Sequence, residues 1–285
     1  MTIGRAATKW ITAFVFVVGR SSINANWAKT TLKAMFGVFL ALALLVPPAA
    51  AEPTRITVRV ISKGAKFVGT SMGGVRIVIR DADTGALLAS GVTQGGTGDT
   101  KRIMVADRKP GSALSTEGAA RFAATIDIDE PRRIEVVALG PLAQRQSANR
   151  VSATQWVVPG RHITGGDGFL LVLPGFVVDV LAPPAHVKLK GTPRRITLRA
   201  NVTMMCGCPI KPGGIWDADR YEVKALIRRN GKPAGSVALT YAGSTSQFSG
   251  DVTVDAPGTY EAVVYAYDPS NGNTGLDRTT FVVAR

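Results

Sequence analysis

Histidine, cysteine and aromatic residues are scarce in this chain of 285 residues. It has two histidines and two cysteines, and 7% of its residues are aromatic. A zinc site needs four good ligands. With only two histidines and two cysteines, the sequence gives little support for a zinc site. No recognised nucleic-acid-binding motif is present either, and we expect no nucleic-acid partner.

Acidic residues are absent from the first 51 positions, which carry five Lys or Arg. An apolar run from Phe36 to Val46 follows Lys33 and leads into two prolines and three alanines. A positive segment, a short apolar segment and small residues predict a secretory signal, here residues 1–51 with cleavage before Glu52. The apolar run of about 11 residues is too short for a transmembrane helix, which needs about 20. We therefore expect an exported protein of the periplasm, the extracellular space or the cell surface, without a transmembrane helix in the mature chain.

The net charge is strongly positive. Removal of the predicted leader leaves 29 of the 34 basic residues against all 20 acidic ones, or about +9. Such a charge attracts anionic surfaces, and it predicts an anionic surface, an acidic glycan or an acidic partner protein as the binding partner. The alternative is that the positive charge serves only to keep the protein soluble.

Helical periodicity is missing from Glu52 onward. Apolar and polar residues alternate in short runs that Gly, Pro, Asn and Asp separate, which is typical of strands. Two prolines after Ala182 interrupt the pattern. The sequence therefore predicts an all-β protein with two tandem sandwiches, residues 52–182 and residues 183–285.

Two segments resemble known domain families. The stretch GVRIVIRDADTGALLASGVT, Gly74 to Thr93, resembles the start of transthyretin-like or carboxypeptidase-regulatory-like domains. The stretch APGTYEAVVYAYDPSNGNTGLDRTTFVV, Ala256 to Val283, resembles the last two strands of bacterial Ig-like domains. These resemblances imply a transthyretin-like sandwich followed by an immunoglobulin-like one, and they imply no activity.

A hydrolase motif is present out of context. GTSMGG, Gly69 to Gly74, matches the nucleophile elbow G-x-S-x-G with Ser71 as nucleophile. The elbow needs a helix directly after it, whereas Val75 to Arg80 alternates as a strand. We therefore predict no enzyme activity from this motif.

The stretch TMMCGCPIKPGGIW, Thr203 to Trp216, holds both cysteines. Three states are open for Cys206 and Cys208: a disulfide, a Cu(I) site, or buried free thiols that complete the core. Met204 or Met205 would add a thioether to the copper site, because thiolate and thioether ligands suit Cu(I). A disulfide across one residue requires Gly207 to turn the chain, since two extended residues span roughly 6.6 Å.

Three further residues are candidates for ligand contact. Trp216 either covers the core beside the cysteine pair or, if exposed, contacts a partner. His162 and Asp167 flank the glycine-rich loop GRHITGGDG, where a metal or glycan site competes with an ordinary solvated loop.

These patterns favour a non-enzymatic binding or structural module. The first alternative is a copper-handling protein that uses the Met-Met-Cys-Gly-Cys stretch. The second is thiol-disulfide exchange at the cysteine pair, which lacks support from any thioredoxin-like βαβ pattern.

Overall fold

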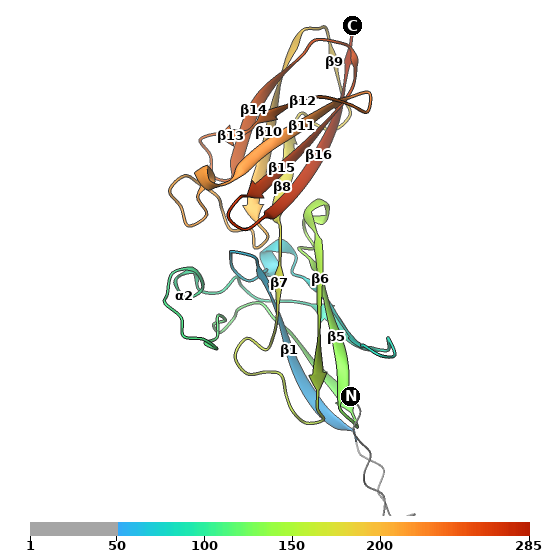
Figure 1. Ribbon diagram of the computed structural model, residues 1–285, viewed down its shortest axis with the longest axis vertical. Helices are drawn as coiled ribbons and strands as arrows, with labels where there is room; N and C mark the ends of the chain where they lie inside the picture. Colours follow the sequence, from blue (N-terminus) through green and yellow to red (C-terminus); the bar gives the residue numbers. More distant parts are fainter. Residues whose placement is uncertain (1–50) are drawn as a thin grey trace, which may run out of the picture. The chain divides into compact units, whose positions relative to one another are not determined.

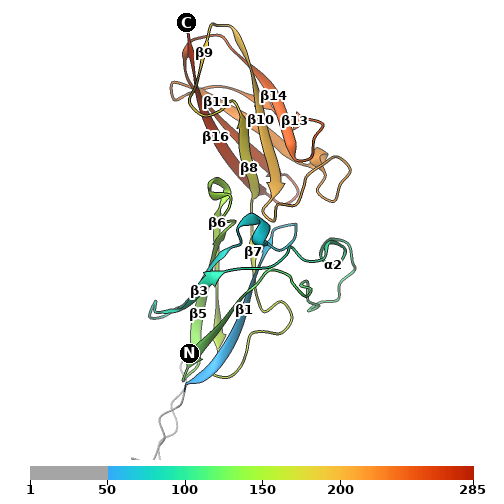
Figure 2. The same cartoon turned by 180° about the vertical axis from the view of Figure 1, so that it is seen from behind.

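The computed structural model describes residues 51–285, which form one compact unit. The fold is all-β, as predicted from the sequence (Figures 1 and 2). The predicted signal segment, residues 1–51, lies outside the described residues except for Ala51. No helix in residues 51–285 is long and apolar enough to cross a membrane.

The first sandwich pairs a three-stranded sheet, β4-β1-β7, with a four-stranded sheet, β3-β2-β5-β6. All neighbours are antiparallel except β1 and β7. Alternate residues of each strand, such as Ile56, Val58 and Val60 of β1, fill the core, as the period of two requires. The strands are β1 (Glu52–Ser62), β2 (Arg76–Asp81), β3 (Leu87–Val92), β4 (Phe122–Ile128), β5 (Arg132–Gly140), β6 (Asn149–Val157) and β7 (Phe169–Leu173).

The second sandwich pairs a four-stranded sheet, β13-β14-β10-β8, with a five-stranded sheet, β12-β11-β15-β16-β9. Along β10 the side chains from Ile196 to Met204 are buried at every second position, as the alternation predicts. Its strands are β8 (Phe176–Ala182), β9 (Val187–Lys190), β10 (Arg194–Met204), β11 (Glu222–Arg229), β12 (Lys232–Ala238), β13 (Thr240–Tyr241), β14 (Gln247–Val254), β15 (Gly258–Asp268) and β16 (Asn273–Ala284).

Strand β8 changes the expected division of the chain. The prolines after Ala182 predict that residues 176–182 belong to the first sandwich, but β8 pairs with β10 of the second. Phe176 and Val178 point into the second core, whereas Val177 between them points into the first. The prolines after Ala182 therefore end a strand of the second sandwich. Separate folding of the two sandwiches stays a prediction.

Helices are few and short in the described part. Ser71 lies in a single 3-10 turn, η1 (Thr70–Met72), and a strand follows it, so the helix that a nucleophile elbow needs is missing there. The long insertion at residues 95–120 carries α2 (Thr100–Met104) and packs Ile103 onto Phe67. The remaining 3-10 turns are η2 (Arg145–Ser147) and η3 (Ala218–Arg220).

Candidate functional site

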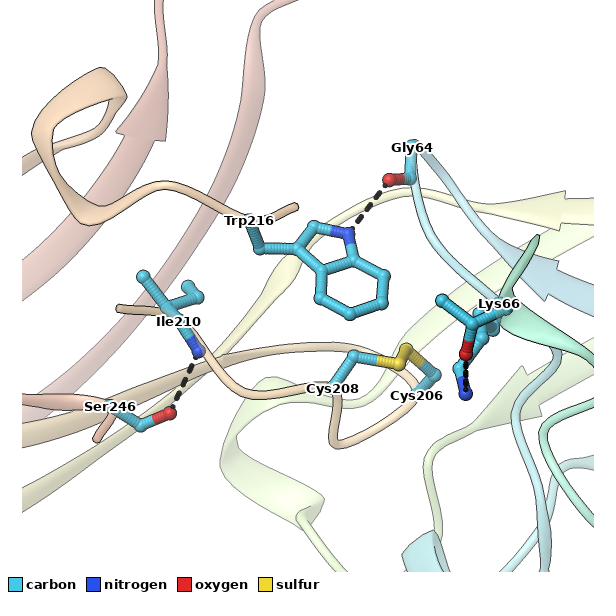
Figure 3. The surroundings of a disulfide bond; sticks show 8 residues. Gly64, Lys66, Cys206, Cys208, Ile210, Trp216 and Ser246 are labelled. Carbon is cyan, nitrogen blue, oxygen red and sulfur yellow. Dashed lines mark hydrogen bonds between the residues drawn. A yellow bond between two sulfur atoms is a disulfide. The ribbon is translucent and has the colours of Figure 1, made fainter. Parts of the chain in front are cut away.

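The cysteine stretch forms a tight hairpin at the end of β10. The Met204 N–H donates to the Cys208 carbonyl at 3.2 Å, and the Gly207 N–H donates to the Met204 carbonyl at 2.8 Å. Gly207 has φ +74°, a conformation that glycine adopts without steric cost. This turn brings the Cα atoms of Cys206 and Cys208 to 5.3 Å, and their sulfurs form a disulfide (Figure 3). Of the three states considered for the pair, the structure contains the disulfide.

The disulfide is enclosed by both sandwiches. Cys206 is 2% exposed and Cys208 is 4% exposed. Trp216 lies beside them, and its indole N–H donates to the carbonyl of Gly64, in the loop after β1, at 3.1 Å (Figure 3). Trp216 itself is 7% exposed. It therefore covers the core beside the cysteine pair, and a contact with an outside partner would require this region to open.

The two methionines of the hairpin point into different cores. Met204 packs in the second sandwich with the cysteines, whereas Met205 packs in the first with Val177. In this oxidised form the four predicted copper ligands do not converge, because the sulfurs of the cysteines are bonded to each other and the methionines diverge. A further thioether lies close to the hairpin: the Sδ of Met72 is 2.6 Å from where a Cβ on Gly207 would stand.

His162 and Asp167 have separate partners. The Nδ1 of His162 accepts a hydrogen bond from the Arg55 N–H at 3.2 Å. The carboxylate of Asp167 accepts hydrogen bonds from the N–H groups of Leu114 and Ser115, each at 2.8 Å. Burial opposes the charge of Asp167, but these hydrogen bonds outweigh it and lower its pKa. Asp167 thus anchors the end of the long insertion, and no group of three His, Cys, Asp or Glu in residues 51–285 is placed to hold a metal.

The turn between β2 and β3 is fixed by Asp81. Its carboxylate accepts the N–H groups of Thr84 at 2.8 Å and Asp83 at 3.0 Å. Arg132 on β5 donates to the same carboxylate at 3.2 Å. The bond from Thr84, with that from Asp83 and the Arg132 contact, lowers the pKa of Asp81 to about 2 against the cost of desolvation. The backbone of this turn is therefore held by the Asp81 carboxylate.

The outer face of the sheet β3-β2-β5-β6 gathers arginines that are scattered in the sequence. The strand register places Arg76, Leu139 and Arg150 side by side on three neighbouring strands. Arg80 and Arg133 lie further along the same face, opposite Glu135 and Trp156. We call this surface the arginine face. Its exposed apolar side chains are Leu87 (56%), Val92 (39%), Leu139 (37%) and Trp156 (62%).

The arginines of this face differ in how they are neutralised. Arg133 forms an ion pair with Asp83, and Arg80 donates to the Gly85 carbonyl at 3.0 Å. Neither Arg76 nor Arg150 forms an ion pair within residues 51–285. Glu135 is the single acidic residue at the outward strand positions of this face. The face therefore carries uncompensated positive charge beside exposed apolar groups.

Comparison with known proteins assigns no family to this chain. No protein-family model matches the chain, and no curated protein matches it. Three solved structures that match it are an engineered protein, the fibronectin(III)-like modules of Clostridium thermocellum CbhA, and Escherichia coli alpha-2-macroglobulin activated by porcine elastase. The first has a TM-score of 0.29 at 16% identity over 42% of this chain, and the match spans 22% of that chain. The second has a TM-score of 0.28 at 14% identity, and the match covers 84% of this chain and 92% of that chain. The third has a TM-score of 0.21 at 11% identity, and the match covers 82% of this chain and 22% of that chain.

These similarities assign the chain to no family. The β-sandwich class stands on the strands and sheets described above. The more specific resemblances, transthyretin-like for residues 74–93 and bacterial Ig-like for residues 256–283, stay predictions.

Proposed function

We propose that this protein is an exported, non-enzymatic binding module that holds an anionic partner on its arginine face. The observation that carries the proposal is the row in which Arg76 and Arg150 flank the exposed Leu139. Export rests on the predicted leader, and an oxidised cysteine pair agrees with a compartment outside the cytoplasm.

The chemistry of the face favours carboxylate, sulfate or phosphate groups. A guanidinium presents a planar fork of N–H donors, and two of these donors can bind two oxygen atoms of one such group at the same time. Neighbouring strands are about 4.8 Å apart, so the Cα atoms of Arg76 and Arg150 are roughly 10 Å from each other across Leu139. Two anionic groups at a similar spacing would engage both arginines at once, while the apolar side chains contact the less polar part of the partner.

Retention on immobilised heparin, a sulfated polyanion, tests this proposal. The double variant Arg76→Glu/Arg150→Glu should elute at much lower salt than the unchanged protein, because it reverses both unpaired charges of the face. The control is Arg199→Glu/Arg229→Glu, which makes the same change in net charge at exposed positions outside the arginine face. Equal losses in the two double variants would mean that overall charge, and no particular face, governs binding.

The cysteine pair serves this module as a local structural lock. Closing a loop of three residues contributes only about 1.6 kcal/mol in the loop-closure model, so the bond fixes the hairpin more than the whole fold. Because both sulfurs are buried, the folded protein should resist dithiothreitol and lose the bond only after unfolding. A bond that dithiothreitol reduces rapidly in the folded protein would favour the alternative of thiol-disulfide exchange.

Copper binding is the second candidate and applies to the reduced protein alone. The observation in its favour is that the thioether of Met72 packs against Gly207, the residue that separates the two cysteines in the sequence. Titration of the reduced protein with Cu(I) should then show binding that Cys206→Ser/Cys208→Ser abolishes and Met72→Leu weakens. If the reduced protein and the double serine variant take up equal copper, the pair has no role in copper handling.

A further inference from the structure

A second exposed surface lies on the second sandwich, on its five-stranded sheet β12-β11-β15-β16-β9. Its outward positions bring together Leu226 of β11, Val263 and Tyr265 of β15, and Leu276 of β16. Leu226 is 46% exposed and Leu276 is 40% exposed. Tyr267 continues the group along β15 at 36% exposure. Neighbouring exposed apolar side chains of this kind mark an interaction surface more often than isolated ones do.

Charges of both signs border this apolar group. Along β11 the outward residues are Glu222, Lys224, Leu226 and Arg228 in that order. The carboxylate of Glu222 accepts the Tyr265 hydroxyl, and burial together with this carboxylate raises the pKa of Tyr265 to about 12. Arg228 forms no ion pair within the described residues. An apolar centre with a polar rim of mixed sign is the usual composition of a protein–protein interface.

We propose that this face binds a second copy of the same chain, sheet on sheet. A two-fold axis crossing the strands between the level of Lys224 and that of Leu226 lays β11 of one copy antiparallel over β11 of the other. Because Glu222 and Arg228 are equally far from that axis along the strand, each Glu222 then faces the other copy's Arg228. The same rotation lays Tyr265 over Val263 of the other copy. It lays Leu226 and Leu276 over the aliphatic stems of the other copy's Lys224 and Arg278. Interfaces of two-fold dimers are self-complementary in this way.

The size and charge of the face agree with a dimer. From the lengths of its strands the sheet covers of the order of 700 Å² in projection, close to the roughly 800 Å² that each partner contributes to a standard interface. The arginine face makes a poor contact with its own copy, because it would oppose arginines to arginines. The mixed charges of the five-stranded sheet avoid that repulsion.

Charge reversal tests the proposed pairing. Sedimentation equilibrium over a range of concentrations should show a monomer–dimer equilibrium for the unchanged protein. Glu222→Arg alone and Arg228→Glu alone should each raise the dissociation constant at least about tenfold, because each opposes like charges at two places across the two-fold axis. The combined variant Glu222→Arg/Arg228→Glu restores opposite charges and should return the constant to near its original value.

Two controls separate this interface from loss of folding or from other contacts. Leu226→Lys should abolish the dimer, whereas Leu139→Lys, a similarly exposed leucine on the arginine face, should leave it unchanged. Thermal unfolding of every variant checks that the fold persists. The proposal is overturned if the protein stays monomeric up to about 100 μM, because a dimer with a larger dissociation constant is weaker than typical specific dimers. It is also overturned by a dimer that ignores the charge reversals, because its interface would then lie elsewhere.

Discussion

Met205 offers a sharp test of how the cysteine hairpin is built into the molecule. Its neighbours Met204, Cys206 and Cys208 pack in the second core, but Met205 is fully buried in the first. Met205→Ala therefore removes a side chain of the first core from the hairpin that follows β10 of the second sandwich. Truncation of a buried Met to Ala costs about 2–5 kcal/mol, since it removes apolar contacts and leaves a cavity. We expect a loss of free energy of unfolding in the upper half of that range, because Met205 is fully buried and most residues of the first core belong to paired strands, which cannot easily close the space.

Urea unfolding followed by two probes measures this loss. Far-ultraviolet circular dichroism reports all strands, whereas fluorescence of a Trp156→Phe protein reports Trp216 beside the disulfide, provided that the leader, which holds the other two tryptophans, has been cleaved. Met204→Ala is the matched control, because the same residue type is removed one position away from the other core. If Met205→Ala lowers the free energy of unfolding by less than about 1 kcal/mol while Met204→Ala costs 2 or more, the first core does not depend on Met205 and the reasoning fails.

Three further predictions concern the hairpin, one turn and the long insertion. Gly207→Ala should cost about 1–2 kcal/mol in urea unfolding, because a side chain at positive φ is strained and the new Cβ would press on Met72; an unchanged midpoint would contradict the turn geometry. Asp81 has its pKa lowered from 3.8 to about 2, so its contribution to stability is complete above pH 4 and is lost as the pH falls toward 2. The stability difference between the unchanged protein and Asp81→Asn should therefore shrink between pH 4 and pH 2, and a constant difference would refute the assignment. Asp167→Ala should speed tryptic cleavage within residues 106–115 several-fold, since it frees two backbone N–H groups from a carboxylate, and equal cleavage rates would show that other contacts hold the insertion.

The local features of the fold were predictable because they depend on short-range periodicity. A period of two continued from Ile196 predicts Met204 and the cysteines on one side and Met205 on the other, and the structure agrees. The Asp-Thr-Gly turn after β2 followed from residues that favour turns. The bend at Gly207 followed from the short span between the cysteines, given a disulfide.

The features that escaped prediction depend on contacts between distant segments. The arginine face arises from the pairing of β2, β5 and β6, and no property of the single strands fixes that register. The bond from Trp216 to Gly64 joins residues 152 positions apart, so its sequence context indicated a buried Trp but no partner. The two prolines after β8 predict a boundary at its end, yet its pairing with β10 places the strand in the second sandwich.

The position of β8 determines where this chain can be divided. A fragment that begins after the prolines, at residue 185, would lack β8 and leave the backbone of β10 with a bare edge, which invites pairing with other chains. A fragment that begins before Phe176 keeps that edge covered but leaves Val177 and Met205 without the first core they fill. Natural shuffling of the second sandwich into other proteins would therefore require a new partner for these two side chains, or their replacement by polar residues.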